Sequence, residues 1–173
     1  DIQERLLPVM ANADLVVANA RRLILGAAEL SVPIIVSEQY PKGLGATVEP
    51  LRAALEQAAE KTEVRRIEKT SFSCDGSDAF LDALEAFERE QIILCGIESH
   101  VCVLQTALNL IEQGAMTFVA ADAVSSRNAA HVPLALERMR QAGAVLPVTE
   151  SILFEMLGDA KHPAFKAVSA LVK

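Results

Sequence analysis

Apolar positions along the chain follow two spacings in turn. Residues 12–30 carry apolar side chains at roughly the helical period, and Asn12 or Asp14 can cap the start of that helix. Residues 33–37 then form a short run rich in β-branched side chains, which predicts a buried strand. The chain therefore opens with a helix followed by a strand.

The same alternation continues to the end of the sequence. Its pattern predicts further strands at residues 64–67, 92–95, 117–121 and 144–148, and helices at residues 51–55, 78–87, 101–113, 128–142, 152–157 and 163–172. Strands that are apolar on both faces and alternate with amphipathic helices indicate a parallel sheet covered on both sides. The predicted fold class is α/β, a three-layer αβα sandwich with a mainly parallel, Rossmann-like sheet, in one domain over residues 1–173.

The composition limits which partners and which cellular compartment we expect for this chain. The 173 residues are 51% hydrophobic, and no apolar run approaches the roughly 20 residues that cross a bilayer, so we expect no membrane contact. A formal net charge of −7 disfavours nucleic acid as a partner. The N-terminal residues lack a secretory pattern, and the three cysteines are odd in number and sparse. We therefore expect a cytoplasmic protein with at least one free thiol.

Cys102 is the strongest candidate for a nucleophile, because it lies at the turn between strand 92–95 and helix 101–113. A cation and the free N–H groups of a helix start lower a cysteine pKa from ~8.5 to between ~3.5 and ~7.5. The same N–H groups stabilise an oxyanion. From position alone, a small packing residue is equally well supported. Cys95 is expected to be an inert core thiol, and a role for Cys74 stays open.

Three segments in the expected order resemble the isochorismatase-like cysteine hydrolases, which include nicotinamidases and N-carbamoylsarcosine amidohydrolases. Residues 96–107 (GIESHVCVLQTA) resemble the nucleophile segment, residues 1–3 (DIQ) the aspartate segment, and residues 68–73 (EKTSFS) the lysine segment. Residues 38–45 and 158–165 are similar to the subgroup called isochorismatase domain-containing proteins. The resemblance covers essentially the whole chain.

The resemblance implies a role for each residue of the site. Asp1 is then the general base, Lys69 favours the charged states of its partners, and Cys102 is the nucleophile. The backbone N–H groups of Glu98 and Cys102 form the oxyanion hole beside a cis Ile97–Glu98 peptide bond. Without the resemblance, Asp1 and Lys69 would be read as solvated surface charges. The resemblance also implies an apolar strand before the aspartate, so we expect one upstream of residue 1.

Five further residues are predicted to bind the substrate, because the fold brings their segments to the carboxyl edge of the sheet. One aromatic wall and two amides would hold a small planar molecule there, from Gln3, Gln39, Tyr40, Phe72 and His100. Each of them alone fits packing or a solvated loop equally well.

No metal or organic cofactor is expected. Nicotinamidases place histidine ligands after the second strand, where this chain has the sequence SEQY at residues 37–40. His100, His131 and His162 show no spacing typical of zinc ligands, and no nucleotide-binding glycine motif is present.

The predicted function is metal-independent hydrolysis of a C–N bond in a small amide or ureido compound through a thioester. The alternatives are hydrolysis of an isochorismate-type enol ether, which does not need a cysteine nucleophile, and a non-catalytic binding or scaffold protein on the same fold. A dinucleotide-binding protein is disfavoured because the glycine fingerprint is absent. Family members usually assemble as dimers or larger oligomers, so the resemblance implies a homo-oligomer.

Overall fold

The computed structural model describes residues 1–173 and has an α/β fold, as predicted. Its strands are β1 (Ile34–Gln39), β2 (Val64–Lys69), β3 (Gln91–Ile97) and β4 (Met116–Ser125). The longer helices are α1 (Ala13–Glu29), α3 (Glu49–Ala59), α4 (Asp78–Phe87), α5 (Leu104–Glu112) and α6 (His131–Ala142). The shorter ones are α2 (Pro41–Leu44), α7 (Thr149–Leu157) and α8 (Phe165–Leu171).

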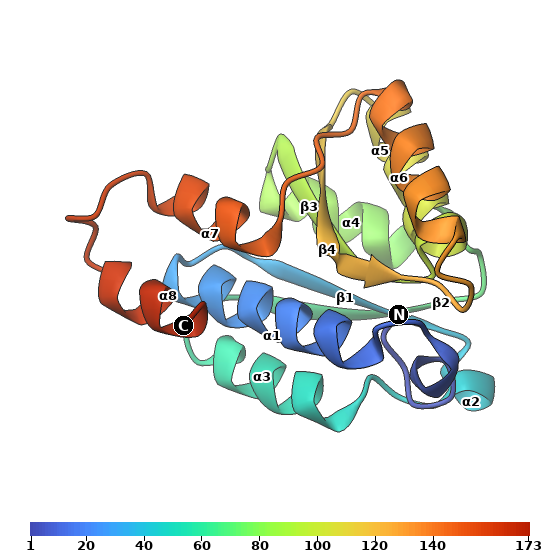
Figure 1. Cartoon of the computed structure of the whole chain (residues 1–173), viewed down its shortest axis with the longest axis horizontal. Helices are drawn as coiled ribbons and strands as arrows, with labels where there is room; N and C mark the ends of the chain where they lie inside the picture. Colours follow the sequence, from blue (N-terminus) through green and yellow to red (C-terminus); the bar gives the residue numbers. More distant parts are fainter.

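Helices cover the strands on both sides. Helix α1 packs against α3, α7 and α8 and crosses β4, whereas α5 and α6 pack together over β4 (Figure 1). Helices α3 and α4 both contact β2. The N-terminus lies beside the carboxyl ends of β1 and β2, which brings Asp1 to the edge where ligands bind in parallel sheets (Figure 1).

The strands form two separate parallel pairs. Strand β1 pairs with β2 from Ile34–Val64 to Gln39–Lys69, and β3 pairs with β4 with a register shift between Leu94 and Gly96. No strand lies between β1 and β3, and both contribute side chains to the apolar cleft that separates the pairs. The strand that we expect before Asp1 and the assignment of residues 1–173 to one domain stay predictions.

Residues 144–148 differ from the prediction, because they make only an isolated bridge between Val145 and Phe118. This segment runs beside β4, and the amide of Val145 donates to the carbonyl oxygen of Thr117 at 3.0 Å. Pro147 has no N–H group to continue the ladder, which accounts for the short pairing.

Several helix starts also differ from the pattern, and two of them have a local cause. The helix predicted at 51–55 extends over α3, because Pro50 occupies its first turn and supplies a favourable φ. The helix predicted at 101–113 begins as a π-helical turn over Ser99–Val103 and becomes regular only in α5. Single π-helical turns are frequent at functional sites.

Two hydrophobic clusters fix the ends of the strands. The larger one lies between β4, α5 and α6 and contains Val103, Leu104, Ala107, Val119, Val124, Ala135, Met139 and Ala144. The second includes Ile2 with Ile97 of β3 and Val16 of α1, all buried. Because Ile2 is anchored there, the neighbouring Asp1 is held at the strand ends. None of the helices combines the length and apolar character that crossing a bilayer requires.

Candidate active site

A buried ion pair lies at the end of β2. The Lys69 ammonium contacts the Asp1 carboxylate with an Nζ–Oδ2 distance of 2.8 Å, and the two side chains are 0% and 3% exposed. The other carboxylate oxygen, Oδ1, accepts a hydrogen bond of 2.8 Å from the Ser37 hydroxyl. Both oxygens of Asp1 are therefore fixed, and Ser37 is a site residue that sequence reasoning missed.

The ammonium of Lys69 has further oxygen acceptors besides Asp1. They are Oε1 of Gln39 at 2.7 Å and the carbonyl oxygens of Phe72 at 3.0 Å and Ser71 at 3.2 Å. The amide of Gln3 is fully buried and bonds the backbone of Gln39. Both glutamines predicted to bind substrate thus have protein partners, and their contact with a substrate stays a prediction.

Cys102 lies in the π-helical turn that joins β3 to α5, and it is partly exposed. Its side chain and those of Asp1 and Ser37 line one cavity. Cys74 lines the same cavity, and its backbone N–H donates to Oγ1 of Thr106 at 3.0 Å. The structure therefore brings the three predicted catalytic residues together from the N-terminus, β2 and the turn after β3.

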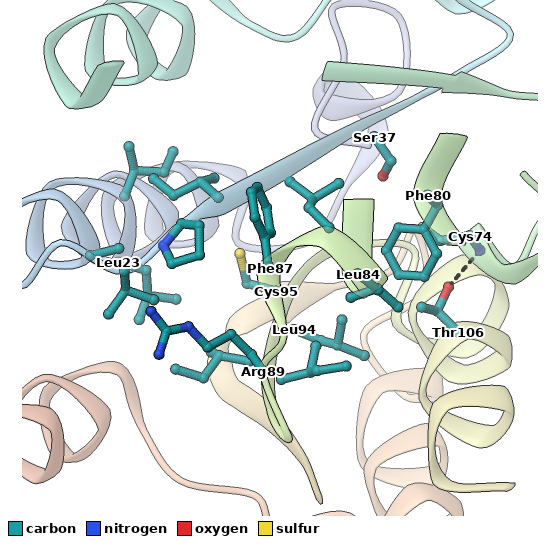
Figure 2. Close-up of a pocket in the computed structure, with 18 of the residues that line it drawn as sticks. Leu23, Ser37, Cys74, Phe80, Leu84, Phe87, Arg89, Leu94, Cys95 and Thr106 are labelled. Atoms are coloured by element: carbon teal, nitrogen blue, oxygen red, sulfur yellow. Dashed lines mark hydrogen bonds between the residues drawn. The ribbon is translucent and has the colours of Figure 1, made fainter. Parts of the chain in front are cut away.

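The cavity has a volume of about 240 Å³, and 18 of its 24 lining residues are hydrophobic. Figure 2 shows Ser37, Cys74 and Thr106 toward one end and Leu23 and Arg89 toward the other, with apolar side chains between them. Asp1 and Cys102 also line this cavity, whereas Lys69 lines a separate polar hollow. The apolar part continues along the cleft between β1 and β3.

Burial shifts the pKa of both Lys69 and the Cys102 thiol. It lowers the pKa of Lys69, and the neighbouring Cys102 and Cys74, when ionised, counteract that effect. Burial also raises the pKa of Cys102 above its ordinary value, although the positive charge of Lys69 pulls it down. The expectation of a lowered thiol pKa is therefore wrong, because desolvation in the cavity outweighs the nearby cation. A neutral thiol needs a base at the moment of attack.

Glu98 and His100 flank the nucleophile turn. The Ile97–Glu98 peptide bond is cis, as predicted. The Glu98 carboxylate is largely buried and accepts hydrogen bonds from the backbone N–H and the side chain of Arg127, at 2.9 and 3.2 Å. Nδ1 of His100 lies 2.8 Å from Oγ of Ser126. The oxyanion hole formed by the amides of Glu98 and Cys102 stays a prediction.

The two predicted aromatic residues are both exposed. Phe72 is 55% and Tyr40 54% exposed, although the carbonyl oxygen of Phe72 contacts Lys69. The Tyr40 ring lies over Gly43, where a Cβ atom would come within 2.3 Å of it, so a larger residue there would displace the ring. Tyr40 and Lys69 line a second, polar hollow. The aromatic groups are thus beside the lysine but outside the apolar cavity.

All three cysteines are free, which confirms the expected free thiol. Cys95 is not in the core, where it was predicted, but is exposed on the cavity wall. Burial raises the pKa of its thiol, which fits the inert thiol that was predicted. No three His, Cys, Asp or Glu side chains lie together in an arrangement that holds a metal ion.

Comparisons with known proteins point to one family. The profile of the family described as Isochorismatase domain matches residues 1–151. Isochorismatase domain-containing protein 2 of Xenopus laevis is 38% identical over 172 residues, which cover 99% of this chain and 80% of that protein.

Solved structures also resemble this chain. The MAR1 ribonuclease of Caenorhabditis elegans has a TM-score of 0.90 and 41% identity, over 99% of this chain and 85% of that one. The YcaC product of Escherichia coli, described as an octameric hydrolase of unknown specificity, has a TM-score of 0.86 and 24% identity, over 98% of this chain and 82% of that one. At that identity the likeness to YcaC concerns the fold.

Proposed function

We propose, from the premise that this chain belongs to the isochorismatase family, that it is a metal-independent cysteine hydrolase of small amides or ureido compounds. The observation that carries the proposal is that Asp1, which is paired with the buried Lys69, lines the same cavity as Cys102. A carboxylate, an ammonium and a thiol are sufficient for acyl transfer without histidine.

In the first step Asp1 takes the proton of the Cys102 thiol while the sulfur attacks the substrate carbonyl carbon. The carbonyl π electrons move to oxygen, and the resulting oxyanion is bound by the backbone N–H groups of Glu98 and Cys102. The raised pKa of Cys102 keeps the resting thiol protonated, so the base acts during the attack. Lys69 keeps its positive charge beside both partners throughout the step.

In the second step the oxyanion collapses and the C–N bond breaks. The protonated Asp1 gives its proton to the departing nitrogen, which leaves as an amine or ammonia, and Cys102 carries a thioester. Water then attacks the thioester carbon and loses a proton to Asp1. Collapse of that intermediate returns the proton to the Cys102 sulfur and releases a carboxylic or carbamic acid.

Gln3, Gln39, Tyr40, Phe72 and His100 remain the proposed substrate contacts. Among these, Tyr40 and Phe72 are exposed beside Lys69 and present rings to an arriving planar molecule.

A panel of small amides and ureido compounds, quenched with acid and analysed by mass spectrometry, tests the proposal. We expect an acyl adduct on Cys102 and loss of turnover in Cys102→Ala. Cys95→Ala removes a second thiol from the same cavity and is the matched control, because it should retain turnover. Turnover that survives Cys102→Ala, or an adduct on Cys95 or Cys74, would refute the proposed nucleophile.

Three other functions are distinguished by the same set of variants. Hydrolysis of an enol ether would proceed in Cys102→Ala, since that chemistry needs no sulfur nucleophile. The Caenorhabditis elegans relative is named a ribonuclease, so single-stranded RNA belongs in the panel. RNA cleavage that Cys102→Ala leaves unchanged would favour that activity. A non-catalytic scaffold predicts no adduct and no turnover with any compound.

We also propose that the chain forms a homo-oligomer in the cytoplasm. The octamer described for YcaC and the exposed apolar side chains of this chain support self-association. Leu134 is 70%, Met116 53% and Val145 46% exposed. Sedimentation of the full chain measures this, and a monomer at micromolar concentration would contradict it.

A further inference from the structure

The lysine of the site is more tightly enclosed than an ion pair requires. Its side chain is 0% exposed, and four oxygens surround its ammonium group within 3.2 Å. An ammonium has only three N–H donors, so the oxygens compete for them. Three of the four are neutral, and the shortest of these contacts is to Oε1 of Gln39, at 2.7 Å.

The orientation of the Gln39 amide is fixed by its second partner. Its Nε2 group donates to the carbonyl oxygen of Thr70 at 2.7 Å, and a carbonyl oxygen is only an acceptor. The amide nitrogen must therefore face Thr70, which leaves Oε1 toward Lys69. Gln39 and Lys69 are also register partners on β1 and β2, so the two backbones hold this contact from both sides.

Gln3 fixes the backbone of Gln39 by hydrogen bonds. The amide of Gln3 is fully buried, donates to the carbonyl oxygen of Gln39 at 3.0 Å and to that of Gly45 at 2.7 Å, and accepts from the Gln39 backbone N–H at 2.8 Å. Gln3 and Asp1 lie on one face of the N-terminal segment, and Gln39 and Ser37 on one face of β1, each pair two residues apart. The N-terminal segment and β1 therefore hold both the Asp1 carboxylate and the Lys69 ammonium.

We infer that Gln39 is a positioning residue, which holds the Lys69 ammonium between Asp1 and Cys102 as a neutral acceptor. This inference rests on the proposed cysteine hydrolase function. A neutral amide fixes the ammonium without cancelling its charge, so the charge continues to act on the Cys102 thiol. A carboxylate in its place would bind the ammonium more strongly and weaken that action.

The charged and titratable groups around Lys69 are few. They are the Asp1 carboxylate, Cys74 and Cys102, and Glu98 acts on Cys102 from the nucleophile turn. The charge of Lys69 pulls the pKa of Cys102 down against burial. Changes at Gln39 should therefore appear in the titration of the Cys102 thiol.

The test measures the rate at which methyl methanethiosulfonate modifies Cys102 between about pH 7 and pH 11.5, with the midpoint fitted from the dependence of the rate on pH and with peptide mass spectrometry separating the three cysteines. The thiolate attacks the sulfenyl sulfur and methanesulfinate leaves, so the rate follows the thiolate fraction. Gln39→Met keeps the side-chain volume without an acceptor. Gln39→Glu keeps the shape and adds a negative charge.

We expect the midpoint of the thiol titration to rise by about one pH unit in Gln39→Met, which is a tenfold lower thiolate fraction. We expect it to rise further in Gln39→Glu. Gln57→Met changes an exposed glutamine of α3 in the same way and should leave the midpoint unchanged. A wild-type midpoint in either Gln39 variant would overturn the inference, since a residue that only fills space or only contacts substrate would not move it.

The two proposals fail separately. If no amide acylates Cys102 while the midpoints shift, hydrolysis is refuted and the positioning role stands. If acyl trapping succeeds while the midpoints stay unchanged, hydrolysis stands and the positioning role is refuted.

Discussion

Replacing Lys69 with methionine tests the buried ion pair directly. The Lys69 and Asp1 side chains are 0% and 3% exposed, so solvent cannot take the place of the missing charge. The Asp1 carboxylate would keep the Ser37 hydroxyl as its side-chain donor. Removing one partner of a buried pair costs about 3–5 kcal/mol of the free energy of unfolding. We expect Lys69→Met to lower the free energy of unfolding by an amount in that range.

A surface ion pair of the same types provides the control. Lys61 contacts Glu29 at 2.5 Å, but the two side chains are 46% and 25% exposed. Lys61→Met should therefore change the free energy of unfolding by about 0–1 kcal/mol.

Urea unfolding near neutral pH, followed by circular dichroism, measures both variants. The double variant Asp1→Asn with Lys69→Met should recover part of the loss, because it leaves no unpaired buried charge. A loss in Lys69→Met no greater than in Lys61→Met would refute the reasoning.

Three further variants extend these predictions. Burial raises the pKa of Cys102 above 9.0, so the folded chain holds that proton more tightly than the unfolded chain. The stability of wild type relative to Cys102→Ser should thus be constant below about pH 9 and fall as the pH rises further; urea unfolding that shows a constant difference would contradict this. Gly26→Ala places a Cβ atom 2.2 Å from Cδ2 of the buried Leu153, and overpacking should cost about 1–3 kcal/mol. A gain in urea-unfolding stability would refute that clash. Ser37→Ala removes a hydrogen bond to the Asp1 carboxylate and should cost about 1.5–3 kcal/mol, less than the lysine variant. Thermal unfolding measures it, and an unchanged midpoint would argue against it.

The alternation of elements was readable from the sequence because the strands are apolar runs and the helices are amphipathic. What the pattern does not contain is the local geometry. Pro147 reduces the strand predicted at residues 144–148 to a single bridge, and the helix predicted at 101–113 opens with a π-helical turn. Both features depend on which backbone groups find partners in the folded chain.

The pairing of Asp1 with Lys69 across 68 residues was anticipated through motifs, whereas the electrostatics of the site was not. The direction in which the pKa of Cys102 shifts depends on burial, and only tertiary packing determines that burial. Ser37 had a signal that sequence reasoning left unused. It precedes Gln39 by two residues on a strand, so alternation places both side chains on the same face.

The assembly of the site from three distant segments makes it dependent on each of them. Asp1 reaches Lys69 across 68 residues, and Cys102 comes from the turn after β3. A local opening of the N-terminal segment would withdraw the carboxylate and let water reach the Lys69 ammonium while the strands stay paired.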